Sequence, residues 1–160
     1  MMQGLFRFRN SIIYYRQQLA MLNSKNITNL LSQVLNPVPE VTSSKPLSIS
    51  LLSTSSKKPL VSCFQNTLEE DTKGDESEFL NTGITPSDNL RIMSLTSLKA
   101  WEQRAKTEYD WLVIRFNMYY IYLYKINDEY LVMLCCDLQY PKVLAIKKLE
   151  KLSEAMRDKL

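Results

Sequence analysis

Residues 110–136 contain three successive runs of aromatic and β-branched residues, and this density of strand-forming side chains constrains the fold more than any other feature. The runs read DWLVIRFN, YYIYLYKI and YLVMLCC. The Asn-Asp-Glu sequence at 127–129 marks a turn between the last two runs. A break at 117–118 separates the first two, without a glycine to support it. Such short connections predict antiparallel neighbours in one sheet.

Two further strands and three helices complete the predicted pattern. A hairpin loop joins the first two strands, two prolines end the first helix, and a single proline marks the start of each of the other two. The order α-β-β-α-β-β-β-α predicts an α/β (α+β) domain in which a five-stranded antiparallel sheet is flanked by three helices. The additional elements are a helix at 24–35, strands at 47–54 and 60–65, and helices at 88–105 and 141–159.

The helix at 88–105 carries an apolar stripe formed by Ile92, Leu95, Leu98 and Trp101. Three-residue spacing places these side chains along one face, and we expect more than half of that stripe to be buried. The stripe predicted for the last helix comprises Val143, Ile146, Leu149, Leu152 and Met156.

Three tyrosines, Tyr120, Tyr122 and Tyr124, share one face of a predicted strand. An aromatic row of this kind stacks bases in proteins that bind single-stranded nucleic acid. The alternative is a sheet face covered by helices or by a partner. Few cations interleave with the row, which favours the covered face.

The formal net charge of +3 comes from the first twenty residues, which contain three arginines and no acid. The rest of the chain has 17 basic and 17 acidic residues and therefore lacks the net basic character that phosphate binding requires. We predict no nucleic-acid partner. Residues 1–20 are compatible with a mitochondrial presequence, a flexible basic tail, or residues upstream of a start at Met21, and we favour the last interpretation.

An acidic segment at 66–86 contains six carboxylates and one lysine. Mutual repulsion and a shortage of apolar residues predict a mobile, solvated loop. Its DTKGDESE sequence lacks the regular ligand spacing of a calcium loop. We therefore predict no metal site there.

The residues that most enzyme sites require are scarce. The chain has no histidine and only three glycines, which excludes histidine-based triads and metal sites and leaves no glycine-rich phosphate loop. Its three cysteines, two of them adjacent, are an odd set unsuited to a disulfide framework, so we expect reduced thiols in a cytosolic compartment. These features predict a non-enzymatic protein without a cofactor.

Three segments resemble the roadblock family: MLNSKNITNLLSQVL at 21–35, NLRIMSLTSLKAW at 89–101, and YLVMLCCDLQYPKVLAIKKLEKL at 130–152. The resemblance is greatest to the branch that includes the roadblock subunits of the lysosomal Ragulator complex and of the fungal vacuolar EGO complex. It covers residues 21–160 and agrees with the predicted order of elements. The long insert at 66–86 and residues 1–20 depart from the family pattern.

The resemblance implies a scaffold subunit on the cytosolic face of the vacuolar or lysosomal membrane. Such a subunit would bind Rag-type GTPases and support amino-acid signalling to the target-of-rapamycin kinase. A separate lipidated subunit would supply the anchor, so contact with the membrane would be indirect. Two alternatives are another roadblock assembly, such as a dynein light chain or a GTPase regulator, and a mitochondrial protein with a cleaved presequence.

The resemblance also implies pairing with another roadblock subunit, as a homodimer or a heterodimer, through the second helix and the strand that follows it. That strand carries apolar side chains on both faces, more than one side of a sheet needs. The helix residues could equally face the chain's own core. The predicted interface residues are Leu95, Leu98, Trp101, Trp111, Val113 and Phe116.

Overall fold

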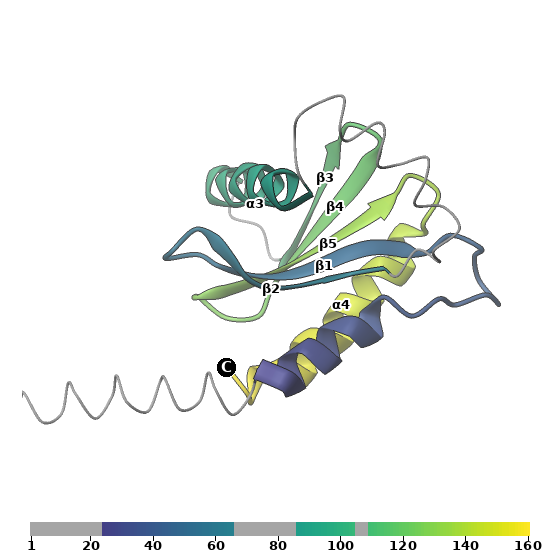
Figure 1. Cartoon of the computed structure of the whole chain (residues 1–160), viewed down its shortest axis with the longest axis horizontal. Coiled ribbons are helices and arrows are strands. Elements are labelled where there is room, and N and C mark those ends of the chain that lie inside the picture. Colours follow the sequence, from purple (N-terminus) through teal and green to yellow (C-terminus); the bar gives the residue numbers. More distant parts are fainter. Residues whose placement is uncertain (1–23, 66–85, 105–108) are drawn as a thin grey trace, which may run out of the picture.

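The computed structural model of the chain describes residues 24–65, 86–104 and 109–160, which form one five-stranded antiparallel sheet with helices on both faces (Figure 1). The helix of residues 24–34 and α4 lie on one face, and α3 lies on the other (Figure 1). The sheet order is β2-β1-β5-β4-β3. The elements are β1 (Pro46–Ser53), β2 (Lys58–Phe64), α3 (Pro86–Gln103), β3 (Trp111–Phe116), β4 (Tyr119–Lys125), β5 (Tyr130–Asp137) and α4 (Lys142–Arg157).

The predicted fold class and order of elements are confirmed. The extension at 1–20 and the acidic loop, apart from its last residue, lie outside the described residues. Within the described parts of the chain, no helix is both long and apolar enough to span a membrane.

Asparagines form the two turns predicted between the last three strands. Asn117 adopts a φ of 55°, a left-handed conformation that asparagine tolerates better than most residues, so β3 turns into β4 without a glycine. At the next turn, Asn127 Oδ1 accepts hydrogen bonds from the backbone N–H groups of Glu129 and Tyr130, each at 2.9 Å. These local interactions hold β3, β4 and β5 in antiparallel register.

The tyrosine row of β4 lies beneath helices, as the favoured interpretation predicts. Tyr122 is 1% exposed and Tyr124 is 8% exposed. Both pack in the core formed with α4 and the helix of residues 24–34. With Tyr122 and Tyr124 buried and only Tyr120 partly exposed, the row does not present a continuous stacking platform for bases.

Lys148 of α4 joins the two helices on this face. Its Nζ donates hydrogen bonds to the carbonyl oxygens of Val34, at 2.9 Å, and Asn36, at 2.6 Å. The last carbonyls of a helix lack partners within the helix and carry partial negative charge, so an ammonium group is a favourable cap. Partial burial lowers the pKa of Lys148. Lys148 therefore fixes the end of the 24–34 helix against α4.

On the opposite face, two serines occupy the contact between α3 and the sheet. Ser94 and Ser97 are fully buried. Ser94 Oγ donates a hydrogen bond to the carbonyl of Leu90 at 2.7 Å, and Ser97 Oγ donates to Met133 Sδ at 3.6 Å. Because each hydroxyl has a partner, these small side chains can be buried at little cost.

The apolar stripe of α4 is displaced at its start from the predicted one. Ala145, Leu149, Leu152 and Met156 are buried, whereas Val143 is 66% exposed. Two residues subtend about 200° on a helix, so a helix that points Ala145 at the core points Val143 into solvent. The prediction that Val143 belongs to the buried stripe is wrong.

Substitution of Lys148 by methionine should lower the free energy of unfolding by about 1–2 kcal/mol, because two carbonyls lose a charged donor. The neighbouring Lys151→Met is the matched control, since the Lys151 ammonium has no hydrogen bond or ion pair to the described residues. Chemical denaturation measures both. Equal effects of the two substitutions would contradict the capping role of Lys148.

Tyr122→Phe should leave the free energy of unfolding unchanged or raise it slightly. The buried Tyr122 hydroxyl has no hydrogen-bond partner among the described residues, so its removal relieves a desolvation cost. Tyr122→Ala should instead cost about 3–5 kcal/mol, because it removes a ring from the core. A loss above about 1 kcal/mol for the phenylalanine variant would show that the hydroxyl is bonded.

Candidate protein interface

β3 is an open edge of the sheet, since β4 is its one partner among the described strands. Its side chains are apolar on both faces. Trp111 and Val113 pack toward the core beneath α4, and Leu112, Ile114 and Phe116 pack toward the core beneath α3. All five remain partly exposed in the isolated chain. An apolar edge of this kind favours pairing with another strand.

The open edge also presents unpaired backbone groups. The N–H of Lys125 on β4 bonds the carbonyl of Asp110 at 2.7 Å. Hydrogen bonding alternates along an antiparallel strand, so every second residue from Asp110 onward faces β4. The backbone N–H and C=O groups of the intervening residues, Trp111, Val113 and Arg115, point to the open side. These three residues form a hydrogen-bonding template for an added strand.

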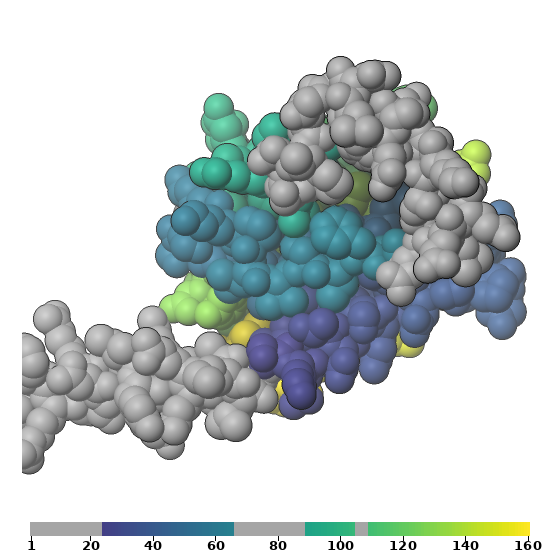
Figure 2. Space-filling view, in the orientation of Figure 1, coloured from purple at the N-terminus to yellow at the C-terminus, as the bar shows by residue number. Residues whose placement is uncertain are grey.

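The other edge of the sheet, β2, differs in ways that disfavour pairing. Pro59 lacks a backbone donor, and Lys58 adds a charge. The pairing of β2 with β1 is also irregular, because its register shifts between Leu51 and Leu52 of β1. Proline, lysine and bulges are the features that protect edge strands from association. β3 contains no proline and no lysine, and its one charged residue is the exposed Arg115. Figure 2 shows the teal β2 edge from the front, above the purple helix of residues 24–34.

α3 exposes apolar side chains as well. Ile92 is 48% exposed and Leu95 is 44% exposed, so the stripe is more than half buried, as expected, but these two side chains keep substantial exposed surface. The cause is the serine contact described above, which turns the adjacent face of α3 to the sheet. Leu98 is 2% exposed and belongs to the chain's own core. Trp101 is partly buried, with the Arg104 guanidinium 3.6 Å from its ring centroid.

The predicted interface residues therefore fall into two groups. Leu98 is unavailable to a partner, and Ile92, which the predicted set omits, is available. The remaining five have exposed surface on α3 or on the open edge strand. They are Leu95, Trp101, Trp111, Val113 and Phe116.

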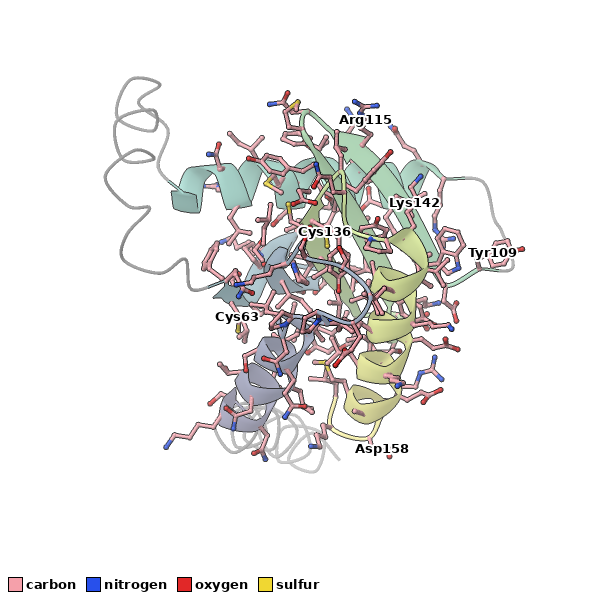
Figure 3. All side chains as sticks on the ribbon, turned by 90° about the vertical axis from the view of Figure 1, so that its right-hand side faces the viewer. Cys63, Tyr109, Arg115, Cys136, Lys142 and Asp158 are labelled. Atoms are coloured by element: carbon pink, nitrogen blue, oxygen red, sulfur yellow. The ribbon has the colours of Figure 1, made fainter. Side chains whose placement is uncertain are left out.

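Aromatic rings and cations surround the α4 side of β3. Tyr109, which is 61% exposed, packs its ring 5.3 Å from that of Trp111. Lys142 Nζ lies 4.6 Å from the ring centroid of Tyr120. Arg115 is exposed, and Figure 3 shows Lys142 near the start of α4. This composition of aromatic and cationic side chains is typical of protein interfaces.

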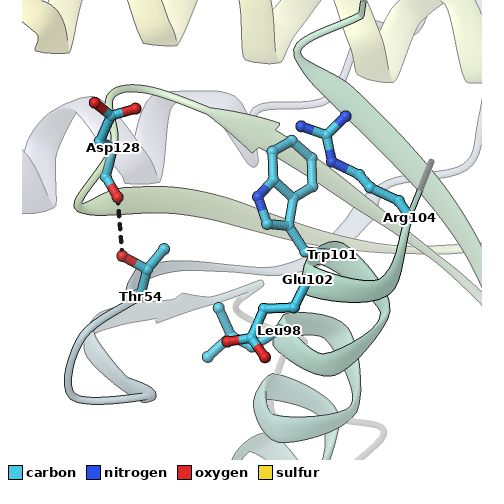
Figure 4. A pocket seen from close by; sticks show the side chains of 6 residues that line it. All are labelled: Thr54, Leu98, Trp101, Glu102, Arg104 and Asp128. Atoms are coloured by element: carbon cyan, nitrogen blue, oxygen red, sulfur yellow. Dashed lines mark hydrogen bonds between the residues drawn. The ribbon is translucent and has the colours of Figure 1, made fainter. Parts of the chain in front are cut away.

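A cleft of about 340 Å³ lies at the end of α3 (Figure 4). Thr54 Oγ1 donates hydrogen bonds to the carbonyls of Asp128 and Glu129 at its margin, at 3.0 and 3.2 Å. The carboxylates of Glu102 and Asp128, which line the cleft, are largely exposed. Among the described residues, no three cysteine or acidic side chains are grouped to hold a metal ion. The cleft suits contact with polar groups of a partner.

The cysteine thiols are not activated. Burial raises the pKa of Cys63, that of Cys135 to about 11, and that of Cys136. A nucleophilic cysteine needs a lowered pKa and access to solvent. All three thiols therefore remain protonated near neutral pH, and Cys135 and Cys136 are also buried.

The family model described as Protein SLM4 matches residues 21–160. The chain belongs to the SLM4 family. The SLM4-family chain shares its fold with MglC from Myxococcus xanthus, at a TM-score of 0.58 and 14% identity, covering 82% of this chain and 97% of that one. It is also similar to a Roadblock/LC7 domain from Streptomyces avermitilis, at a TM-score of 0.54 and 11% identity, covering 82% and 94% of the two chains.

A third similar structure is the gliding protein MglB from Thermus thermophilus, with a TM-score of 0.56, 12% identity, and coverage of 84% and 88%. At these identities the likeness establishes the fold alone. It confirms that this SLM4-family chain has the roadblock fold, as the sequence resemblance implies. Comparison with curated protein sequences finds no significant match.

Two substitutions on α3 should separate the exposed face of the SLM4-family chain from its core. Leu98→Asp should lower the free energy of unfolding by about 3–5 kcal/mol, because it buries an unpaired charge. Leu95→Asp should cost far less in a dilute monomeric sample. Thr96→Asp, at an exposed position beside Leu95, controls for the added charge on the helix. Equal destabilisation by the two leucine substitutions would contradict the exposed face.

Proposed function

We propose that this chain is a non-catalytic scaffold subunit that pairs with another roadblock subunit through β3 and α3. The resulting unit binds Rag-type GTPases at the cytosolic face of the vacuolar or lysosomal membrane. There it supports amino-acid signalling to the target-of-rapamycin kinase. A separate lipidated subunit attaches the assembly to the membrane, so contact of this chain with the membrane is indirect.

The observation that carries the proposal is the open β3 edge beside the exposed Ile92 and Leu95. An unprotected edge with apolar side chains on both faces is an aggregation hazard unless a partner covers it. The protection at β2 indicates which edge the partner uses. Pairing at β3 would satisfy the free backbone groups and cover the apolar side chains together.

Membership of the SLM4 family supports the scaffold role over residues 21–160. The sequence resemblance to the Ragulator and EGO roadblock subunits supports the more specific assignment to Rag-type GTPases and amino-acid signalling. The protonated thiols and the absence of histidine from the sequence support a role in binding rather than catalysis. The exposed aromatic and cationic side chains around β3 are the contacts that such a role would use.

Val113→Asp should abolish association while the isolated subunit keeps its secondary structure. The substitution places a charge on the open edge, where Val113 is partly exposed. Affinity purification of the tagged chain from its own cells should then recover at least about tenfold less roadblock partner and GTPase. Circular dichroism checks the fold of the variant, because a loss of secondary structure would assign Val113 to the core.

Leu60→Asp is the matched control, because it adds the same charge to the protected β2 edge, at a side chain that is 51% exposed. It should retain every partner. Equal recovery with the two variants would rule out β3 as the interface. Partners that include neither a roadblock subunit nor a GTPase would contradict the proposed function as a whole.

A further inference from the structure

We propose that Arg115, Tyr120, Lys142 and Val143 form a basic patch that docks an acidic segment of a partner protein. Carboxylates of that segment pair with the two cations, and an apolar side chain of the segment packs on Val143. This inference goes beyond the proposed function. The basic patch consists of side chains on the α4 face of the sheet, whereas pairing at the open edge uses the backbone of β3.

Tyr120 brings the two cations of the basic patch together. It lies directly opposite Arg115 in the register of β3 and β4, and opposed side chains have Cβ atoms about 5 Å apart. Lys142 Nζ lies 4.6 Å from the centroid of the Tyr120 ring. Figure 3 shows Arg115 and Lys142 at the same end of the molecule. An edge strand and the start of α4 thus each place a cation beside one ring.

Neither cation is neutralised by the described parts of the chain. Arg115 is exposed and has no ion pair, hydrogen bond or ring contact with them. Lys142 is also exposed, and its one contact there is with the Tyr120 ring. The acid that shortly precedes α4, Asp137, already accepts three hydrogen bonds from neighbouring loop residues. The basic patch therefore keeps two positive charges for a partner.

Lys142 occupies a position where a cation is unfavourable. It is the first residue of α4, and the start of a helix carries partial positive charge that favours acids. The first turn of α4 contains no acid, and no side chain caps it. Departures from local preference of this kind are expected at functional sites. An acidic group of a partner would relieve the repulsion that Lys142 adds.

Exposed apolar side chains adjoin the two cations. Val143 follows Lys142 and is 66% exposed, and Met118, in the turn two residues before Tyr120, is 62% exposed. Two cations alone would suit any anion, inorganic phosphate included. Apolar surface beside them favours a peptide that carries both carboxylates and an apolar residue, because such a peptide covers the whole patch.

The side chains of the basic patch stay accessible when β3 is paired. Side chains stand roughly perpendicular to a sheet, while strand pairing runs in its plane. Arg115 can therefore contact a docked segment above the sheet at the same time as its backbone pairs with another strand. The basic patch would extend an interface at β3 by a second contact of different chemistry.

Fluorescence anisotropy with the purified full chain tests the basic patch. The probe is a labelled synthetic peptide in which glutamates alternate with leucines, and its control has glutamine in place of every glutamate. Only the glutamate peptide should bind, and added salt should weaken its binding. Arg115→Glu and Lys142→Glu should each weaken it at least about fivefold, because each replaces an attraction with a repulsion.

Lys147→Glu is the matched control, since it makes the same charge change at an exposed position of α4. Five residues subtend about 140° on a helix, so Lys147 points away from Lys142 and should change the affinity less than about twofold. Chemical denaturation separates lost binding from lost structure. Lys142→Glu should not lower the denaturation midpoint, because an acid suits the start of a helix.

The apolar part of the basic patch has its own variant. Val143→Asn should weaken binding of the glutamate peptide about two- to threefold with no change in the fold, because the side chain is 66% exposed. Unchanged affinity in this variant would remove Val143 from the patch. Displacement of the peptide by inorganic phosphate as effectively as by unlabelled peptide would show a simple anion site and overturn the peptide surface.

Two further results would overturn the proposal. Equal weakening by Arg115→Glu, Lys142→Glu and Lys147→Glu would show an effect of net charge alone. Binding that appears only after the six acids of residues 66–85 are replaced by glutamine would assign the patch to the chain's own acidic segment. These measurements use the purified chain and its α4 face, so the loss or retention of partners by Val113→Asp bears on the proposed function alone.

Discussion

Burial of β5 on both faces is the constraint on which the rest of the structure depends. All six residues from Leu131 to Cys136 are buried, with alternate side chains packed beneath α4 and beneath α3. A central strand of this composition requires a neighbour on each side and a covering layer on each face. β1 and β4 supply the neighbours, and three helices supply the layers. This arrangement leaves β2 and β3 at the margins of the sheet, where the helices cover less.

The two edge strands, β2 and β3, are both exposed to pairing with other chains, but only β2 carries residues that hinder it. Both have unpaired backbone groups. β2 resists pairing through Pro59 and Lys58, whereas β3 keeps a regular backbone and partly exposed apolar side chains on both faces. The asymmetry therefore favours β3 over β2 as the edge that a partner would cover, without reference to any relative. The exposed Ile92 and Leu95 on α3 extend the apolar surface on one side of that margin.

The sequence predicts the sheet better than the faces of the helices. Alternation and turn residues locate β3, β4 and β5 correctly, including the glycine-free turn at Asn117. The apolar character of both faces of β3 also predicts the edge. Apolar periodicity misses the face of α3 that lies against the sheet, because two of its buried residues, Ser94 and Ser97, are polar. Their hydroxyls bond the Leu90 carbonyl within the helix and Met133 Sδ on β5.

The same limit explains two other features that no periodicity reveals. Lys148 looks like one of several solvated lysines in α4, yet its ammonium bonds the carbonyls of Val34, at the end of the 24–34 helix, and of Asn36, 114 and 112 residues earlier in the chain. Trp101 lies in an apolar stripe, yet Arg104 covers its ring. Both contacts depend on tertiary placement and on the length of a charged side chain. Such side chains bury their alkyl stems while the charged group finds a distant partner.

If β3 pairs with one partner as proposed, the unequal edges would also limit how large an assembly can grow. A β3 strand that pairs with one roadblock subunit has a neighbour on both sides, so no further strand can add at that edge. Further growth of the sheet would require pairing at β2, where Pro59 removes a donor and the register irregularity between Leu51 and Leu52 disturbs the neighbouring strand. Open-ended association through the sheet is thus disfavoured by the residues of β2 themselves. An edge strand open to pairing does not lead to continued aggregation when the other edge of the sheet is protected. In this chain β3 is the open edge and β2 is the protected edge, on opposite sides of one sheet.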